Sequence, residues 1–358
     1  MAQCRLDGKQ PIDLSVSNPT LARLNLPDPA LRIDAARYAP SAAGSAEARE
    51  AISRYYAEEF ASTVSPDDLL LTTSTSEAYS YCFKLIADAG AKVLLPQPSY
   101  PLLQFLVEAE GLVPAAYPLH EADGQWILDR DRLAAACDDS TRAIVVVNPN
   151  NPTGHFLSID DAEWLIAFAG KRYWIICDEV FSDYAWAASA NALRSLSLPR
   201  ADNVLCLSGL SKICALPQMK LGWIAMPPVP AIRYNLESIA DTYLSVSTPI
   251  QAATPQWLAR RAEFQAPIRQ RCLENLALIA AACKGSNWNA LPVEAGWTAI
   301  LRGPANLDEE DFVLQLLEAG FLTQPGYYYD LPFACSLVLS LLIPPDDLAR
   351  GLSAITIS

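Results

Sequence analysis

Short, continuous apolar runs recur through the first two thirds of the chain and alternate with helical segments. The clearest runs are AKVLLP (91–96), RAIVVV (142–147), RYWIIC (172–177), NVLCLS (203–208) and LGWIAM (221–226). Strands that helices cover on both faces have this unbroken apolar character, because neither face meets water. Strands that alternate with helices also build βαβ units. The pattern therefore predicts an α/β fold whose sheet is mostly parallel and covered on both sides.

The pattern changes after about residue 228. A long helical region extends to about residue 283, and it is followed by a strand (297–302), a helix (308–319), a strand (336–342) and a final helix (346–356). This order predicts a smaller α+β domain after the larger α/β domain. Residues before about 30 are too rich in proline to form a core element, so we expect them to pack as an arm.

The composition disfavours several functional classes. The 358 residues carry a formal net charge of −14, which argues against binding to the phosphate backbone of nucleic acids. No apolar run approaches the roughly 18 residues of a membrane span, and the opening MAQCRLDGKQ lacks the apolar segment of a signal peptide. Nine scattered cysteines and only two histidines, His120 and His155, predict reduced thiols in the cytoplasm and no metal site.

Lys212 stands at the junction of two predicted buried strands, 203–208 and 221–226. A charged residue at such a junction has two interpretations. Its ammonium group can reach water along an apolar stem, or it can serve as a desolvated amine that takes part in chemistry.

Polar residues follow other predicted strands as well. Ser74, Thr75 and Ser76 open a helix, where free amides and hydroxyls could bind an anion; the spacing of Ser74 and Glu77 also fits a capping box, and the two readings are compatible. NPNNPTG (148–154) and Asp178 follow two further strands. Ligands bind beyond the carboxyl ends of parallel strands. Together with Lys212, these groups predict a pocket for a phosphorylated, nitrogen-containing aromatic aldehyde.

Three motifs occur in a characteristic order: NPNNPTG (148–154), CDEVFSDY (177–184), and SGLSK (208–212) followed eight residues on by a basic residue before LGW. In order and spacing they resemble the class I and II aminotransferases, the aspartate-aminotransferase-like, fold type I enzymes that use pyridoxal phosphate (PLP). The resemblance extends from SNPT (17–20) to the final helix. It implies a seven-stranded-type, PLP-binding large domain at 35–250, a small domain formed by 1–34 and 251–358, and a homodimer with shared active sites.

The resemblance also implies roles for single residues. Lys212 matches the catalytic lysine that forms a Schiff base with PLP and shuttles a proton. Asp178 matches the carboxylate that keeps the pyridine nitrogen protonated. Asn151 matches the donor to the cofactor's phenolic oxygen and is also a predicted substrate contact. Tyr100 matches the aromatic residue that stacks on the ring, although it also fits ordinary core packing. The positions that match phosphate ligands are Ser74, Thr75, Ser76, Ser211 and Tyr38, the last offered to the partner subunit's site or else an ordinary loop tyrosine.

The chain departs from the family pattern at three positions. Phe181 replaces a tyrosine that supplies a hydroxyl to the phenolic oxygen, and Lys220 replaces an arginine that binds the phosphate with both nitrogens. Val338 stands where the family has the arginine that clamps the substrate α-carboxylate. Arg302, at the end of WTAILR (297–302), is the predicted replacement for that clamp, and a surface salt bridge is the alternative.

Three functions compete on this basis. The first is a PLP-dependent transaminase that moves an amino group between an amino acid and a 2-oxo acid through a Lys212 Schiff base. The second is a lyase, decarboxylase or cyclase on the same fold, because the missing clamp at Val338 changes how a substrate is oriented. The third is a non-catalytic PLP-binding module of the kind found in some transcription regulators. Lys212, Asp178 and the acidic composition argue against this third function.

Overall fold

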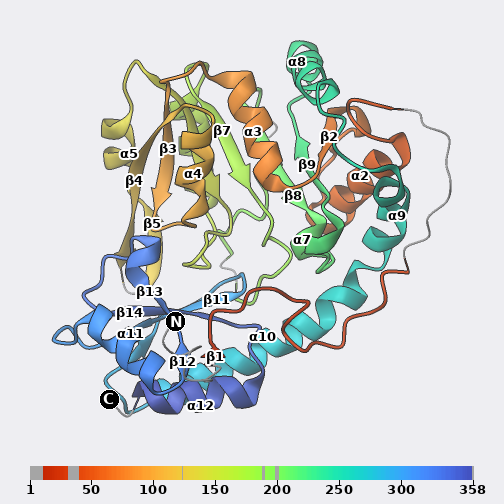
Figure 1. The fold of residues 1–358 in the computed structure, drawn as a ribbon. Coiled ribbons are helices and arrows are strands. Elements are labelled where there is room, and N and C mark those ends of the chain that lie inside the picture. Colours follow the sequence, from red (N-terminus) through yellow and green to blue (C-terminus); the bar gives the residue numbers. More distant parts are fainter. Residues whose placement is uncertain (1–10, 31–39, 123, 188–189, 198–200, 357–358) are drawn as a thin grey trace.

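Figure 1 shows the computed structural model, which describes residues 11–30, 40–122, 124–187, 190–197 and 201–356. A large sheet with helices on both sides lies above a smaller sheet, and a long helix runs between the two parts. Tyr38, predicted to bind phosphate, lies outside the described residues. No described helix has the length and apolar character needed to cross a bilayer.

The large sheet contains eight strands in the order β2-β9-β8-β7-β6-β3-β4-β5. Their bounds are β2 (Leu69–Thr72), β3 (Lys92–Gln97), β4 (Val113–Ala122), β5 (Gln125–Leu128), β6 (Thr141–Val147), β7 (Trp174–Asp178), β8 (Val204–Gly209) and β9 (Gly222–Ala225). The strands from β4 through β3, β6 and β7 to β8 run parallel, whereas β9 lies antiparallel between β8 and β2. The predicted α/β fold with a mostly parallel sheet is confirmed. In the described part of the chain the sheet exceeds the expected seven strands, because β4 turns back into an antiparallel hairpin with β5.

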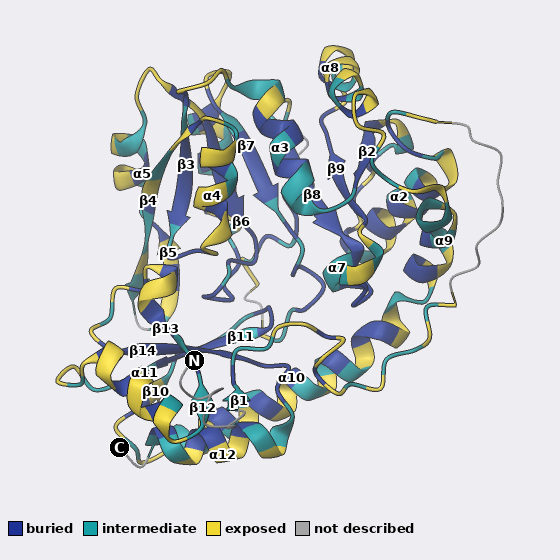
Figure 2. Ribbon diagram, in the orientation of Figure 1, coloured by how far each residue is buried: buried dark blue, intermediate teal, exposed yellow. Residues whose placement is uncertain are grey.

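Helices cover both faces of the central part of this sheet, so β2, β6, β8 and β9 are almost wholly buried, whereas the edge strands β4 and β5 are partly exposed (Figure 2). One face packs against α2 (Ala46–Phe60), α5 (Arg130–Ala136), α6 (Ile159–Ala169) and α9 (Thr248–Ala259). The other packs against α3 (Thr75–Ile86), α4 (Leu102–Ala109) and α8 (Pro230–Asp241). The start of α6 follows from its sequence, since the Ser158 hydroxyl accepts a hydrogen bond from the Asp161 amide at 3.0 Å.

The smaller sheet has the order β10-β11-β14-β13, and all its neighbouring strands are antiparallel. Its strands are β10 (Asn289–Ala290), β11 (Thr298–Arg302), β13 (Gln324–Pro325) and β14 (Ser336–Ser340). The helices beside it are α10 (Arg261–Cys283), α11 (Glu309–Glu318) and α12 (Pro345–Thr356). These elements confirm the predicted α+β character of the C-terminal region.

Helix α10 joins two hydrophobic cores. Phe264, in its first turn, packs in the core of the large sheet, whereas Ile268 and Ile279 pack in the core of the small sheet. Pro267 lies between these two groups. A proline inside a helix removes one backbone hydrogen bond, so the helix changes partners where its own backbone support is reduced.

The N-terminal arm packs on the small sheet. Strand β1 (Ile12–Asp13) pairs in parallel with β12 (Phe321–Leu322). Leu14 is fully buried, and its carbonyl accepts from the Ser340 amide at 3.0 Å. The domain bounds at residues 34/35 and 250/251 stay a prediction, because the first falls outside the described residues and the second falls inside α9.

The burial of Leu14 generates a test of how the arm contributes to stability. A Cβ atom at Gly351 of α12 would lie 2.5 Å from Leu14 Cδ1, which shows how closely the leucine fits. We expect Leu14→Ala to lower the free energy of unfolding by about 2–5 kcal/mol, because it leaves a cavity in the small core. Chemical denaturation measures the change.

Leu21→Ala is the matched control, since Leu21 belongs to the same arm but is 68% exposed. We expect a change within about 0.5 kcal/mol for this variant. Equal effects of the two substitutions would contradict the docking of the arm.

Candidate active site

The register of the large sheet brings several strand ends to one edge. Asp178, the last residue of β7, lies opposite Leu207 of β8. Gly209, the last residue of β8, pairs with Gly222, and Gly222 pairs with Thr72 at the end of β2. The segments that carry the predicted cofactor residues therefore leave the sheet at neighbouring points.

Lys212 lies on α7 (Leu210–Ile213), a single helical turn directly after β8. Its Nζ lies 4.9 Å from the ring centroid of Trp297 and 5.3 Å from that of Phe181, and the side chain keeps only partial access to solvent. Loss of hydration lowers the pKa of Lys212 to about 8, and the nearby charge of Asp178 opposes this change. At neutral pH a minor fraction of Lys212 is therefore an uncharged amine, which can act as a nucleophile or a base.

Asp178 presents its carboxylate close to Lys212. Loss of hydration raises the pKa of Asp178 to about 6, whereas the Val180 amide, the Tyr79 hydroxyl and the charge of Lys212 act to lower it. The Val180 amide donates to Oδ1 at 3.2 Å. At neutral pH the carboxylate is still mostly ionised, in surroundings where a charge needs a cationic partner. A protonated ring nitrogen would be such a partner.

The N-terminus of α3 faces the start of β9. The Ser74 hydroxyl accepts from the Glu77 amide at 3.2 Å, while the amides of Thr75 and Ser76 have no partner within the helix. Gly222 makes this close approach possible, because a Cβ atom there would lie 2.9 Å from the Ser74 carbonyl carbon and 3.1 Å from the Thr75 nitrogen. The helix start is thus both capped and able to receive an anion.

The loop 148–154 carries Asn151 and is held at both ends. The Asn148 amide donates to the Asp178 carbonyl at 2.8 Å, and the Thr298 hydroxyl of β11 donates to the Pro152 carbonyl at 2.9 Å. The Oδ1 atom of Asn151 is buried and has no hydrogen-bond partner. Such an atom is costly to leave unpaired, so the amide of Asn151 is suited to a ligand.

The other predicted cofactor residues differ in how near they lie to Lys212. Tyr100 is 44% exposed, and its pKa is raised by burial and by the charge of Asp178, which places it within reach of that carboxylate. Ser211 precedes Lys212 on α7 and is partly buried, and Phe181 is 8% exposed beneath Lys212. Lys220 is exposed, immediately before the start of β9. It has a left-handed backbone with φ of 52°.

Arg302 has other partners than the one predicted for it. Its guanidinium lies 3.7 Å from the Glu121 carboxylate and 5.5 Å from the ring centroid of Phe333, and its side chain is 43% exposed. Trp297, the residue before β11 that contacts Lys212, is five positions away, which is roughly 16 Å along an extended strand. Arg302 thus forms the salt bridge that was the alternative, and its role as the carboxylate clamp stays a prediction.

Three aromatic residues near the site were missed by the sequence reasoning. Trp297 covers the Nζ of Lys212, the Tyr184 hydroxyl donates to the Lys212 carbonyl at 2.8 Å, and the Tyr79 hydroxyl lies close to Asp178. Trp297 begins WTAILR (297–302) and Tyr184 ends CDEVFSDY (177–184), so the sequence had pointed to these segments but not to these two side chains. Nothing in the sequence marks Tyr79, which lies one turn inside α3.

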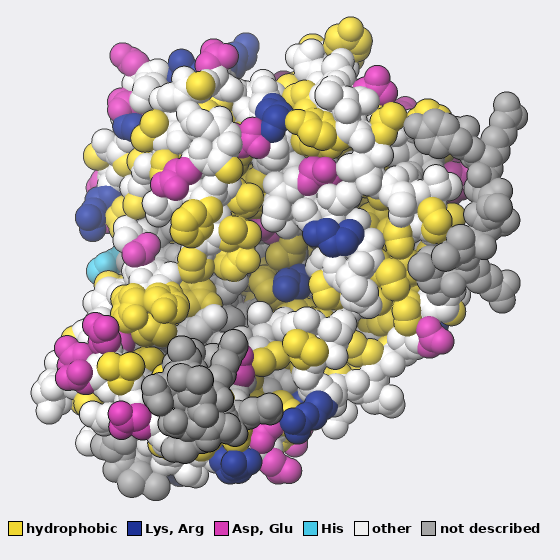
Figure 3. Space-filling view, in the orientation of Figure 1, with side chains coloured by type: hydrophobic (Ala, Val, Ile, Leu, Met, Phe, Trp, Pro, Cys, Tyr) yellow, Lys and Arg dark blue, Asp and Glu magenta, His cyan; other side chains and the backbone are white. Residues whose placement is uncertain are grey.

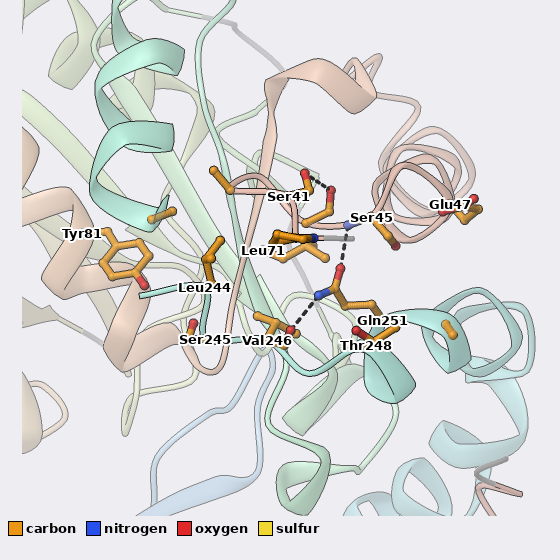
Figure 4. Close-up of a pocket in the computed structure, with 15 residues that line it drawn as sticks. Ser41, Ser45, Glu47, Leu71, Tyr81, Leu244, Ser245, Val246, Thr248 and Gln251 are labelled. Atoms are coloured by element: carbon orange, nitrogen blue, oxygen red, sulfur yellow. Dashed lines mark hydrogen bonds between the residues drawn. The ribbon is translucent and has the colours of Figure 1, made fainter. Parts of the chain in front are cut away.

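Two hollows mark this region of the surface. The face in Figure 3 is hollowed near its middle, where hydrophobic side chains border a basic side chain. A second cavity of about 360 Å³ lies beside α2 and the start of α9 (Figure 4). There Gln251 accepts from the Ser45 amide at 2.6 Å, and Ser245 donates to Glu77 of α3 at 2.7 Å. The second cavity therefore adjoins the anion-binding end of the site.

Among the residues that the structure describes, no group of three or more histidine, cysteine, aspartate or glutamate side chains is placed to hold a metal ion.

The comparisons with known proteins agree on one family. The family model for aminotransferase class I and II matches residues 10–355. A tyrosine aminotransferase of Caenorhabditis elegans is 29% identical over 63% of this chain and 49% of its own length. An S-alkyl-thiohydroximate lyase of Arabidopsis thaliana is 30% identical over 62% of this chain and 49% of its own. The chain thus spans about half the length of these curated relatives.

Solved structures agree with the fold. An alanine aminotransferase of Pyrococcus furiosus superposes with a TM-score of 0.88, covering 99% of this chain and 94% of that one at 23% identity. At this identity the likeness concerns the fold alone.

The raised pKa of Asp178 generates a stability prediction for the protein stripped of any bound cofactor. Because the pKa rises from 3.8 in the unfolded chain to about 6 in the fold, the fold loses stability as the pH rises from about 4 to 6. Asp178→Asn removes this loss and retains an acceptor for the Val180 amide. We expect it to raise the free energy of unfolding at pH 8 by about 1–3 kcal/mol.

Denaturation of wild type and variant at pH 8 and pH 4 measures this difference. The gap should close at the lower pH, where the carboxyl is mostly protonated in the fold. A gap of the same size at both pH values would show that desolvation of the charge is not its cause.

Proposed function

Because the chain belongs to the class I and II aminotransferase family, we propose that it is a PLP-dependent enzyme that transfers an amino group between an amino compound and an oxo compound. An amino acid and a 2-oxo acid are the pair that the family implies. The observation that carries the proposal is Lys212, a desolvated amine close to the carboxylate of Asp178. A solvated surface lysine would keep its usual pKa.

The residues present fit PLP at each of its polar groups. The start of α3, brought close to β9 by Gly222, suits the phosphate. Asp178 suits the protonated pyridine nitrogen, and the amide nitrogen of Asn151 would be the donor to the phenolic oxygen. Lys212 suits the aldehyde carbon, since its amine is partly uncharged at neutral pH.

When bound, PLP supplies an electron sink for the bonds at the substrate's amino-bearing carbon. The side chains of the protein would position the cofactor and the substrate and would transfer protons between them. Lys212 would hold the cofactor through Nζ, and when free of that bond its amine would carry a proton to and from the substrate carbon. Trp297 and Phe181 keep water away from that nitrogen, and the Tyr184 hydroxyl fixes the backbone of Lys212.

Two departures from the family change how the cofactor is held. Phe181 packs its ring beneath Lys212 and has no hydroxyl, so Asn151 is left as the proposed donor to the phenolic oxygen. Lys220 is exposed and offers a point charge rather than the two parallel hydrogen bonds of an arginine. Both changes favour looser binding of PLP than in a site with tyrosine and arginine.

A PLP-dependent lyase is the second candidate. One relative is named an S-alkyl-thiohydroximate lyase, and Val338 stands in an apolar cluster where the family has its carboxylate-binding arginine. A substrate that is oriented differently can lose a different bond at the same cofactor. The two candidates differ in the fate of nitrogen, which a lyase releases as ammonia and a transaminase passes to an acceptor.

The assembly and location of the protein are proposals as well. We expect a homodimer in the cytoplasm, as the family and the scattered unpaired cysteines imply. The cavity of Figure 4 supports a dimer, because Leu244, which lines it, and Tyr243, whose ring packs on Tyr81 of the same lining, are exposed. Sedimentation of a fully active monomer would contradict the dimer.

The role of Lys212 can be tested by labelling. Protein incubated with PLP and reduced with borohydride should carry the pyridoxyl group on Lys212, because that amine is the desolvated one. Peptide mapping by mass spectrometry identifies the labelled residue. The control Lys220→Ala should keep the label, and a label on any lysine other than Lys212 would contradict the proposal.

The proposed reaction is tested by following nitrogen. PLP-loaded protein, an amino donor labelled with ¹⁵N and an excess of an oxo acceptor should give the labelled amino group on the acceptor. Lys212→Ala should abolish this transfer, since the group that holds the cofactor and moves the proton is lost. Release of labelled ammonia without transfer would favour the lyase.

A further inference from the structure

The helical turn that carries Lys212 needs support from outside itself. Helix α7 contains only four residues, and a single turn cannot pair its last carbonyls within its own length. Ile213, which follows Lys212, is fully buried, so its carbonyl cannot turn to bulk water. Because a buried carbonyl without a partner is destabilising, other elements of the fold have to supply the donors.

Gln265 of α10 supplies one of these donors. Its Nε2 atom donates to the Ile213 carbonyl at 3.0 Å and to the Asp183 carboxylate at 2.5 Å. An amide nitrogen carries two hydrogens, so both are used by these two bonds. The side chain is 7% exposed and is thus withheld from water. Gln265 therefore connects α10 directly to the residue that follows Lys212.

Asp183 determines how the amide of Gln265 is oriented. Its Oδ2 atom accepts from Gln265, and its Oδ1 atom accepts from the Tyr55 hydroxyl of α2 at 2.5 Å. Burial raises the pKa of Asp183 to about 6, so the group is still mostly ionised at neutral pH. An ionised carboxylate can only accept hydrogen bonds, so the amide has to present its nitrogen and not its oxygen. The donor that reaches the Ile213 carbonyl is thereby fixed in place.

A second contact from α10 supports the same turn. Arg269 lies four residues after Gln265, on the same face of the helix. Its guanidinium donates to the Asp183 carbonyl and lies 5.6 Å from the ring centroid of Tyr184. The Tyr184 hydroxyl in turn donates to the Lys212 carbonyl at 2.8 Å. One face of α10 therefore acts on α7 at two points.

The direction of the Lys212 side chain depends on this support. Its Nζ atom is held 4.9 Å from the ring centroid of Trp297 and 5.3 Å from that of Phe181. Since α7 has no second turn to resist rotation, a displaced Ile213 carbonyl also changes the direction of the neighbouring side chain. Reacting groups have to be aligned closely, and a misplacement of about 1 Å can lower a rate by roughly 100-fold.

Resting on the proposed function, we infer that Gln265 is a positioning residue for Lys212 and that Asp183 holds it in the required orientation. Gln265 acts through the backbone of α7 and contributes no group to the reaction itself. It sets the direction from which the Lys212 amine approaches the cofactor. The three sequence motifs do not include Gln265, because it belongs to a helix that follows them in the chain.

Gln265→Met tests the inference on the cofactor-free protein, because it keeps an unbranched side chain and removes both donors. Reductive methylation with formaldehyde and cyanoborohydride, followed over pH by peptide mapping, measures the pKa of Lys212, since only the uncharged amine reacts. The wild type should give a pKa of about 8. We expect the variant to move toward the value of about 10.4 of a hydrated lysine, because a loosened turn lets the amine reach water.

Gln270→Met is the matched control, since Gln270 lies on the same helix but is exposed. It should leave the pKa of Lys212 at the wild-type value. Asp178, the charge that acts on Lys212, is retained in both variants. An unchanged pKa of Lys212 in folded Gln265→Met would overturn the inference. The measurement needs neither cofactor nor turnover, so it decides the inference even if the proposed function fails.

Attachment of PLP gives a second readout. At pH 8 we expect Gln265→Met to lower the rate at which PLP bonds to Lys212 by at least about tenfold, because the amine is misdirected. Pyridoxine 5′-phosphate has an alcohol in place of the aldehyde and cannot react with the lysine, so its affinity should change by less than about threefold. A wild type that binds neither compound would contradict the proposed function and leave the pKa of Lys212 to decide the inference.

A second variant covers the case in which circular dichroism shows that Gln265→Met does not fold. Gln265→Asn keeps an amide for Asp183 but is one carbon shorter, so it cannot also reach the Ile213 carbonyl. We expect it to change the pKa of Lys212 and the rate of PLP attachment in the same directions. Wild-type values for both in this variant would overturn the inference.

Discussion

The close approach of β8, β9 and β2 at the edge of the large sheet is the constraint on which the site depends. Gly209 and Gly222 pair across β8 and β9, and a Cβ atom at Gly209 would lie 2.9 Å from the Leu221 carbonyl oxygen. Gly222 in turn leaves room for the start of α3. Larger residues at these two points would push the helix away from the turn that carries Lys212. The anion-binding end and the amine can lie side by side only because both positions lack a side chain.

Strand alternation explains how two adjacent carboxylates serve different purposes. Asp178 faces the ligand space, whereas Glu179 points to the opposite face of the sheet, where its carboxylate accepts from Ser195 and the Leu196 amide. Successive side chains of an extended chain point in opposite directions. Burial raises the pKa of Glu179 to about 7, and these hydrogen bonds oppose the rise. Glu179 thus anchors the segment at Ser195 and Leu196 to the core, while Asp178 remains available to bind a ligand.

Much of this architecture could be predicted from the sequence, since it follows from patterns that are local along the chain. Buried parallel strands are continuous apolar runs, and Asp178 and Lys212 follow such runs directly, so their meeting at one edge follows from the fold class. The partner of Arg302 could not be predicted, because Glu121 lies on the β4–β5 hairpin and only the folded chain brings it near. Strands β4 and β5 were missed for a different reason, since both are partly exposed and lack the apolar run of a central strand.

Helix α10 joins the two hydrophobic cores and thereby affects how closely Lys212 is enclosed. This continuous helix packs in the core of the large sheet at Phe264 and in the core of the small sheet from Ile268 onward, with Pro267 between them. Trp297 covers Lys212 from the small sheet, so the distance between the two cores also sets how tightly the amine is enclosed. The dryness of the space around the reactive amine therefore depends on how this one helix, with Pro267 at the junction, joins the two cores.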